Sequence, residues 1–101
     1  MLPKSKRVNK ALFDEVFKKG SVSNGSFFSL RSTRSSDGTH IAFVAPKTVA
    51  KTAVKRNALR RKGYNSLPKE LPAINGLFFF KKNALSATKE NLKNDIKKLL
   101  G

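Results

Sequence analysis

The sequence predicts an α+β fold in which helices pack on a small sheet. Apolar residues recur with helical spacing near the start and the end of the chain, and stretches with extended patterning lie between them. Turn and breaker residues separate these segments, in the order helix, strands, helix, strand, helix. This order gives a mixed α/β domain, and the length of 101 residues favours one domain that spans residues 1–101.

The first predicted helix follows Asn9, whose side chain can cap it, and it ends at Gly20. Its apolar side chains recur at i, i+1, i+4 and i+5 and form one stripe: Leu12, Phe13, Val16 and Phe17. The stripe is about 140° wide, which is more than one packing seam requires, so one of its edges is free to be exposed.

Extended patterning begins at Ser21 and continues to about Thr33, and its alternation places Phe28 and Arg31 on opposite faces. Residues 35–38 have turn chemistry, of which Asp-Gly is the strongest part. The strand predicted over residues 40–45 is apolar on both faces, which favours a central position in the sheet.

A second helix is predicted from near Thr52 to Tyr64 or Leu67, with Gly63 as a position where it can end or fray. Residues 73–80 form the next predicted strand, with Gly76 as a candidate bulge, and their three phenylalanines are expected to belong to the core. Ser86 is the predicted cap of a last amphipathic helix.

Charge is the most distinctive property of the composition. The chain has 22 lysines and arginines against six acidic residues, which gives a formal net charge of +16. Self-repulsion of this size opposes a compact state unless an anionic partner offsets it, so nucleic acid or an acidic membrane surface is expected. Short apolar runs such as Leu77–Phe80, and an N-terminus without a signal-peptide pattern, argue against the membrane. The absence of cysteine fits a cytoplasmic protein.

The basic residues concentrate in the middle of the chain. Residues 38–69 contain eight basic residues and no acidic residue, and six of the eight lie between Lys51 and Lys62. A solvated helix face usually alternates the sign of its charges, because like charges at i, i+4 destabilise a helix. Phosphate binding explains this segment better, since Lys and Arg side chains fix proteins on a nucleic-acid backbone.

The same segment resembles a known family. Residues 51–61 contain Arg-Asn followed two residues later by Arg-Arg, and they are similar to the Arg-Asn-x-x-Lys/Arg-Arg signature of the bacterial ribonuclease P protein. Residues 47–51 are similar to its lysine-rich lead-in, residues 13–20 to its first helix, and residues 27–31 to its following strand. The first four residues also resemble a typical start, so the resemblance covers roughly the first two thirds of the chain.

The resemblance implies a three-helix α/β sandwich on a small central mixed sheet, similar to the second domain of ribosomal protein S5, with the basic helix in a left-handed βαβ crossover. It implies that the basic segment binds the RNA subunit of ribonuclease P through Lys47, Lys51, Lys55, Arg56, Asn57, Arg60, Arg61 and Lys62. It also implies a cleft between the first helix and the sheet for the single-stranded 5′ leader of precursor tRNA, formed by Phe13, Phe17, Phe28 and Arg31. Aromatic rings stack on any base, which suits leaders of varied sequence.

The residues do not predict a catalytic or metal site in this chain. The only histidine, His40, opens a strand after a turn, and the six carboxylates lack the spacing of a two-metal nuclease. By resemblance, Mg²⁺-dependent hydrolysis of the leader belongs to the RNA subunit, and the protein alone is expected to hold no cofactor. The expected partners are the ribonuclease P RNA and the precursor tRNA leader, with no membrane and no obligatory protein partner.

Two alternatives share the size and the charge. A structural ribosomal protein would also be small and basic, and a nonspecific DNA-binding protein would carry a similar net charge. The Arg-Asn signature downstream of a Phe-x-x-x-Phe helix favours the ribonuclease P subunit, since charge alone does not separate the three classes.

Overall fold

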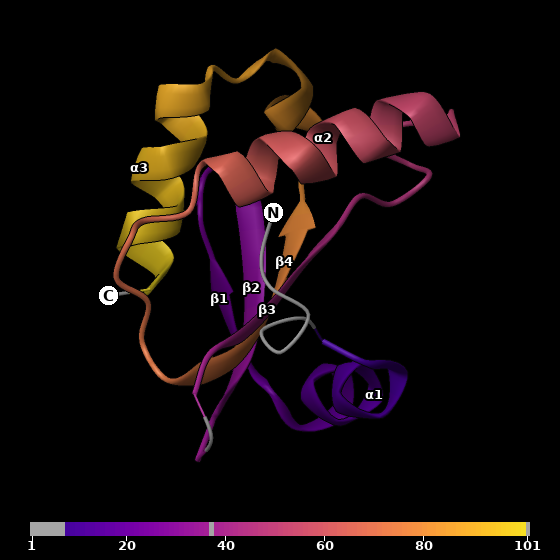
Figure 1. Cartoon of the computed structure of the whole chain (residues 1–101). Coiled ribbons are helices and arrows are strands. Elements are labelled where there is room, and N and C mark those ends of the chain that lie inside the picture. Colours follow the sequence, from indigo (N-terminus) through magenta and orange to yellow (C-terminus); the bar gives the residue numbers. More distant parts are fainter. Residues whose placement is uncertain (1–7, 37, 101) are drawn as a thin grey trace.

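The computed structural model describes residues 8–36 and 38–100. Within these residues, three α-helices, four strands and one 3₁₀ helix follow one another: α1 (Lys10–Lys19), β1 (Ser21–Asn24), β2 (Phe28–Arg34), β3 (His40–Val44), α2 (Ala53–Asn65), β4 (Ile74–Phe80), η2 (Lys82–Ser86) and α3 (Lys89–Leu100). The helices pack on the sheet, so the predicted α+β class is confirmed (Figure 1). The first four residues and Asp37 of the predicted turn lie outside the described residues.

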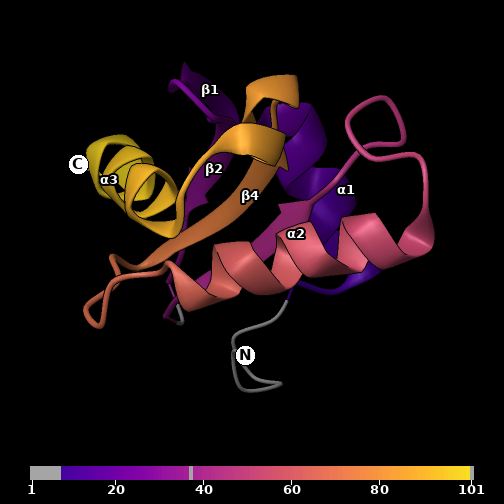
Figure 2. The ribbon, with the colours of Figure 1, turned by 90° about the horizontal axis from the view of Figure 1, so that it is seen from above.

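The strands form one mixed sheet in the order β1-β2-β4-β3. Strand β2 pairs antiparallel with β1 and β4, whereas β3 and β4 are parallel and are connected through α2. Helix α1 lies on one face of the sheet, and α2 and α3 lie on the other (Figures 1 and 2). The sandwich and the crossover through the basic helix are therefore as predicted, while the left hand of the crossover stays an expectation from the resemblance.

Strand β4 is apolar on both faces of the sheet. Phe78 and Phe80 point toward α2 and α3 and join the larger core, in which Phe78 is fully buried. Leu77 and Phe79 point the opposite way, toward α1, whose Val16 is fully buried. Because side chains alternate along a strand, one run of four apolar residues contributes to two cores.

Strand β3 lies at the edge of the sheet, so its predicted central position is wrong. The strand is apolar because other elements cover its faces, and not because it has two neighbouring strands. Ile41 and Phe43 are buried in the core with α2, while Ala42 and Val44 are half-buried on the other face. The outer edge of β3 therefore borders a surface that α1 and α2 share.

The extended segment predicted over residues 21–33 is divided into two strands by a turn that α3 holds in place. The carboxylate of Asp95 accepts the backbone N–H groups of residues 26, 27 and 28 at 2.9, 3.0 and 3.1 Å. These three bonds satisfy a carboxylate that is only 5% exposed and that would otherwise be costly to bury. A Cβ at Gly25 would lie 2.6 Å from both carboxylate oxygens, so a side chain there would displace Asp95.

Helix α2 begins next to Thr52, close to its predicted start, and Thr52 caps it. The hydroxyl of Thr52 accepts the backbone N–H of Lys55 at 3.2 Å. The helix continues through Gly63 to Asn65, so the alternative end at Gly63 is wrong. A Cβ at position 63 would lie 2.6 Å from Cδ1 of Phe43, so the glycine allows α2 to pack directly on β3.

Two smaller expectations are also corrected. Gly76 pairs in register with both β2 and β3, so it forms no bulge. Thr88 takes the capping role predicted for Ser86: its hydroxyl accepts the N–H of Asn91 at 3.1 Å, and the Asn91 side chain accepts the N–H of Thr88 at 3.2 Å. Ser86 instead ends the 3₁₀ helix η2.

We expect Gly63→Ala to destabilise the protein, although alanine favours a helix over glycine by about 1 kcal/mol. The added Cβ meets the Phe43 ring in a packed core, and overpacking of this kind costs about 1–3 kcal/mol. Urea unfolding measures the change. The control is Ala58→Gly at an exposed position of the same helix, which should lose about 1 kcal/mol through propensity alone. A stabilised Gly63→Ala variant would contradict close packing of α2 on Phe43.

Candidate nucleic-acid interface

A groove with a volume of about 950 Å³ opens along the edge of β3, between α1 and α2. Its floor is apolar, one wall is an aromatic ring of α1, and the other wall consists of polar and basic residues of α2. The residues that line it are Phe13, Ala42, Phe43, Val44, Ala45, Arg56, Asn57, Arg60, Arg61, Tyr64 and Asn65. An apolar floor beside guanidinium groups can accept a base and its phosphate together.

Neutral oxygen atoms position two arginines of the α2 wall. Nη1 of Arg56 donates to the carbonyl oxygens of Ala50 and Lys51 at 3.1 and 3.0 Å, which fixes the loop before α2. Nη2 of Arg60 donates to the side-chain oxygen of Asn57, one turn earlier on the same helix. Because none of the three acceptors is charged, these bonds bring no negative charge that would offset the two guanidinium groups at the groove.

The eight predicted RNA-binding residues do not share one surface. Four of them line the groove: Arg56, Asn57, Arg60 and Arg61. Lys62 points to the other side of α2, where its ammonium donates to the carbonyl oxygen of Ala87 at 2.7 Å. Lys55 precedes Lys62 by seven residues, is exposed, and lies on the same side of the helix. Lys47 and Lys51 are exposed in the loop before α2.

Three phenylalanines form an aromatic cluster on the α1 face of the sheet: Phe13, Phe17 and Phe79. The rings of Phe13 and Phe17 are stacked with centroids 6.1 Å apart, and Phe79 meets both edge-on at 6.5 and 6.1 Å. The guanidinium carbon of Arg31 lies 4.4 Å from the centroid of Phe17, and its Nη1 donates to the Phe17 carbonyl at 2.9 Å. Phe17 remains 44% exposed, so solvent still reaches this residue despite these contacts.

Phe28 does not belong to this surface, which corrects its predicted place in the leader cleft. Its ring is fully buried on the opposite face of the sheet, in contact with Phe43, Phe78 and Phe80. A base cannot stack on a ring that solvent does not reach, so Phe28 is a core residue. Alternation along β2 predicts the same separation between Phe28 and Arg31.

Phe79 is the cluster residue that sequence reasoning assigned to the core. Phe79 pairs with Ser29 of β2, on the same face of the sheet as Arg31. The period of two along β4 already separates Phe79 from Phe78 and Phe80. The sequence does not show that α1 leaves this face partly open, and the aromatic position was therefore missed.

The described residues contain no group of three or more His, Cys, Asp or Glu side chains that could hold a metal ion. Nor does any helix in the described part of the chain have the length and the apolar character needed to cross a membrane.

Solved structures with the same fold include ribonuclease P proteins from two bacteria. The RNase P protein of Staphylococcus aureus is 19% identical, with a TM-score of 0.80 over 96% of this chain and 94% of that chain. A mutant of the same protein, described as defective in mRNA degradation activity, is 20% identical, with a TM-score of 0.81 over 96% and 86%. The Thermotoga maritima protein is 15% identical, with a TM-score of 0.70 over 87% of each chain. No curated protein gives a significant match.

The fold and the groove define a small basic α+β protein with a surface suited to nucleic acid. The sequence model of the ribonuclease P family matches residues 2–101, so the chain belongs to this family. Membership implies a subunit of ribonuclease P that works together with the ribonuclease P RNA.

We expect Phe28→Ala and Phe17→Ala to differ clearly in stability. Phe28 is fully buried, and the loss of a buried phenylalanine costs about 3–5 kcal/mol of unfolding free energy. Phe17 is 44% exposed, so its loss should cost about 1–2 kcal/mol. Thermal and urea unfolding measure the free energy of unfolding of both variants. Equal losses of stability would show that Phe17 belongs to a closed core.

Proposed function

We propose that this protein binds the ribonuclease P RNA through the basic wall of the groove and holds the single-stranded 5′ leader of precursor tRNA on the aromatic cluster. In this way it assists Mg²⁺-dependent removal of the leader during tRNA 5′ maturation in the cytoplasm. The observation that carries the proposal is the continuity of the two surfaces: Phe13 belongs to the aromatic cluster and also lines the groove, whose other wall includes Arg60. A strand of RNA on the cluster thus reaches the guanidinium groups of α2 without leaving the protein.

The aromatic cluster has the chemistry of a single-strand binding surface. Stacking on an aromatic ring is worth about 1–3 kcal/mol per base and tolerates any base. Arg31 is fixed over Phe17 by its bond to the Phe17 carbonyl, so a cation stands beside the exposed ring. A base on Phe17 with its phosphate near Arg31 uses both groups together.

The α2 wall has the chemistry of a phosphate-binding surface. Arg60 and Arg61 are exposed at the groove, and residues 38–69 contain no carboxylate that could neutralise them. Arginine binds phosphate in a bidentate way, which fixes the orientation of the RNA as well as adding affinity. This surface therefore supports contact with the structured RNA of the enzyme.

We assign hydrolysis to the RNA subunit and its Mg²⁺ ions, and we assign positioning and charge screening to the protein. The polar side chains that line the groove belong to arginines, asparagines and one tyrosine, and no histidine, carboxylate or cysteine is among them. The +16 charge reduces the repulsion between two polyanions, the RNA subunit and its precursor tRNA substrate.

We expect the RNA-free protein to leave precursor tRNA intact, whereas the protein together with its RNA subunit should raise leader removal at low Mg²⁺. Gel analysis of labelled precursor tRNA measures both reactions. An mRNA is included as a second substrate, because the Staphylococcus aureus mutant is described as defective in mRNA degradation. Cleavage of either RNA by rigorously RNA-free protein would contradict the assignment of hydrolysis to the RNA subunit.

Two double variants should separate the two surfaces. Arg60→Ala with Arg61→Ala should weaken binding of the RNA subunit and flatten the plot of log K against log salt by about 0.7–0.9 per lost phosphate contact. Phe17→Ala with Phe79→Ala should weaken binding of a leader oligonucleotide by about 1–3 kcal/mol per lost stack and leave the salt slope unchanged.

The matched control for the arginine variant is Lys69→Ala with Lys82→Ala, which removes the same charge from exposed sites outside the groove. Fluorescence anisotropy over a range of salt concentrations gives all slopes. An RNA-subunit slope that is the same in the arginine variant and the control would exclude α2 from the interface.

A further inference from the structure

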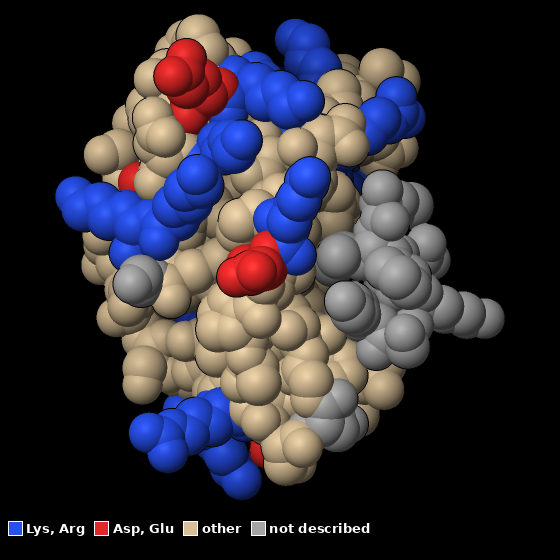
Figure 3. All heavy atoms as spheres, turned by 60° about the vertical axis from the view of Figure 1, so that its left-hand side comes forward, with Lys and Arg blue, Asp and Glu red and all other residues tan. Residues whose placement is uncertain are grey.

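Helix α3 carries a row of lysines on its outer face that neither proposed surface includes. Lys89, Lys93 and Lys97 are exposed and line a shallow groove of about 520 Å³ together with Glu90 and Asn94. Successive members of this lysine row are four residues apart, which corresponds to about 6 Å along the helix axis. In Figure 3, which brings this side of the molecule forward, Lys and Arg side chains form a diagonal band across the surface.

The lysine row lies on the opposite side of the sheet from the aromatic cluster (Figure 2) and does not line the groove. Figure 2 shows α3 and α1 on opposite sides of the sheet. Lys62 of α2 extends the row, because its ammonium lies 2.7 Å from the carbonyl oxygen of Ala87, two residues before Lys89. Lys62 thus belongs with the positive charge of α3 and not with the arginines of the groove.

The fold does not require these lysines. The inner face of α3 makes the packing contacts through Leu92 and Ile96, which are fully buried, and through Asp95, which holds the β1–β2 turn. Like charges at i, i+4 destabilise a helix. No ion pair involving these lysines is present in the described part of the chain, and Glu90 is the only acidic residue that lines the shallow groove.

We propose that the lysine row, extended by Lys62, binds the phosphate backbone of a double-stranded arm of the ribonuclease P RNA, as a second contact separate from the groove. The inference rests on the proposed function for the identity of the RNA. A duplex fits better than a single strand, because α3 has no aromatic residue on which an unpaired base could stack. Double-stranded RNA is recognised mainly through its phosphates and its shape, and a row of cations can provide this recognition.

An anionic membrane fits this surface less well than a duplex. A helix that lies on a membrane inserts an apolar face among the lipids. The apolar face of α3 is already packed on the sheet, where Leu92 and Ile96 are fully buried. The face of α3 that a partner can reach is therefore charged and not apolar.

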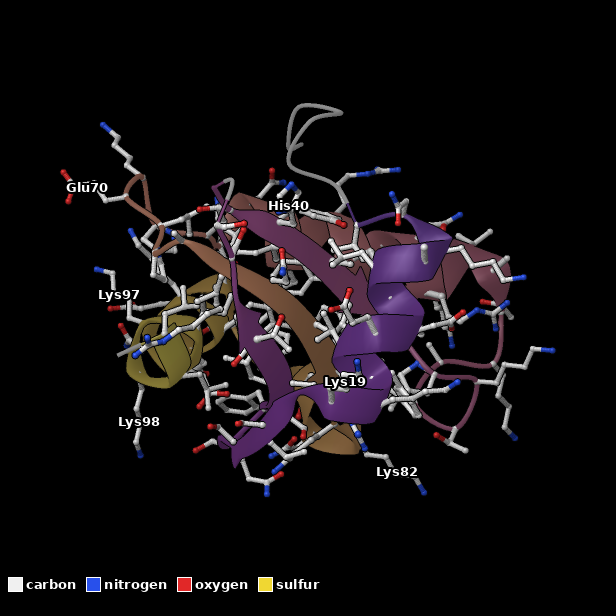
Figure 4. The ribbon with its side chains drawn as sticks, turned by 90° about the horizontal axis from the view of Figure 1, so that it is seen from below. Lys19, His40, Glu70, Lys82, Lys97 and Lys98 are labelled. Atoms are coloured by element: carbon white, nitrogen blue, oxygen red, sulfur yellow. The ribbon has the colours of Figure 1, made fainter. Side chains whose placement is uncertain are left out.

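The test compares Lys89→Gln/Lys93→Gln/Lys97→Gln with the control Lys69→Gln/Lys82→Gln/Lys98→Gln, which removes the same charge from scattered exposed sites. Figure 4 shows Lys82, Lys97 and Lys98 projecting from the surface in different directions. The probes are a blunt RNA duplex of about 20 base pairs, the RNA subunit, a single-stranded leader oligonucleotide and vesicles of equal parts phosphatidylglycerol and phosphatidylcholine. A third variant with arginine at the three row positions keeps the charge.

We expect the glutamine row variant to flatten the salt slope for the duplex and for the RNA subunit by about 2–3 relative to the control. It should bind the leader oligonucleotide as the control does, and the arginine variant should retain duplex binding. Duplex binding equal to that of the control, or loss of vesicle binding alone, would overturn the inference. If the Arg60/Arg61 variant still loses RNA-subunit binding in that case, the proposed function stands without the second contact. If neither variant changes binding to the RNA subunit, both fail.

Discussion

The packing of β4 between two layers of side chains is the interaction on which the rest of this molecule depends. Phe78 and Phe80 complete the core under α2 and α3, and Leu77 and Phe79 hold α1 from the other face. Each fully buried side chain of this size contributes about 1.5–3 kcal/mol, so a short strand stabilises both layers. The central place of β4 between β2 and β3 makes this possible, because both of its backbone edges are already paired.

The two faces of the sheet differ in how completely helices cover them, and the proposed function depends on this difference. The face under α2 and α3 is closed, whereas α1 is a single short helix that buries only Val16 completely. Phe13, Phe17 and Phe79 therefore serve as a thin core and as an accessible aromatic surface at the same time. Under the proposed function, the stability of α1 and the affinity for a single strand are coupled through the same three rings.

The sequence predicts structural features that depend on neighbouring residues, such as the positions of the helices. It does not predict features that depend on contacts between distant residues. Asn9 caps α1 as expected, and the basic segment forms α2, which begins near Thr52 as expected. The division of residues 21–33 into two strands depends on Asp95, a contact across 69 residues. The edge position of β3 follows from strand order, which periodicity within one segment does not specify. The separation of Phe28 from Arg31 follows from the alternation along β2, which the sequence does contain. On α2, four of the eight predicted residues line one groove, and on the sheet Arg31 lies with the aromatic cluster whereas Phe28 does not.

Several cations in the described part of the chain are held in place by neutral acceptors, which do not offset their charge. Arg31, Arg56 and Lys62 donate to backbone carbonyl oxygens, and Arg60 donates to an asparagine. Asp95, one of the six acidic residues, is occupied by backbone N–H groups. A carboxylate partner would orient each cation equally well but would cancel its field, whereas a carbonyl orients it without cancelling it. Positive charge from the net +16 is thus exposed on at least two faces of the molecule. A large folded polyanion can contact both faces at once, whereas a small anion cannot, so the polyanion fits this protein better.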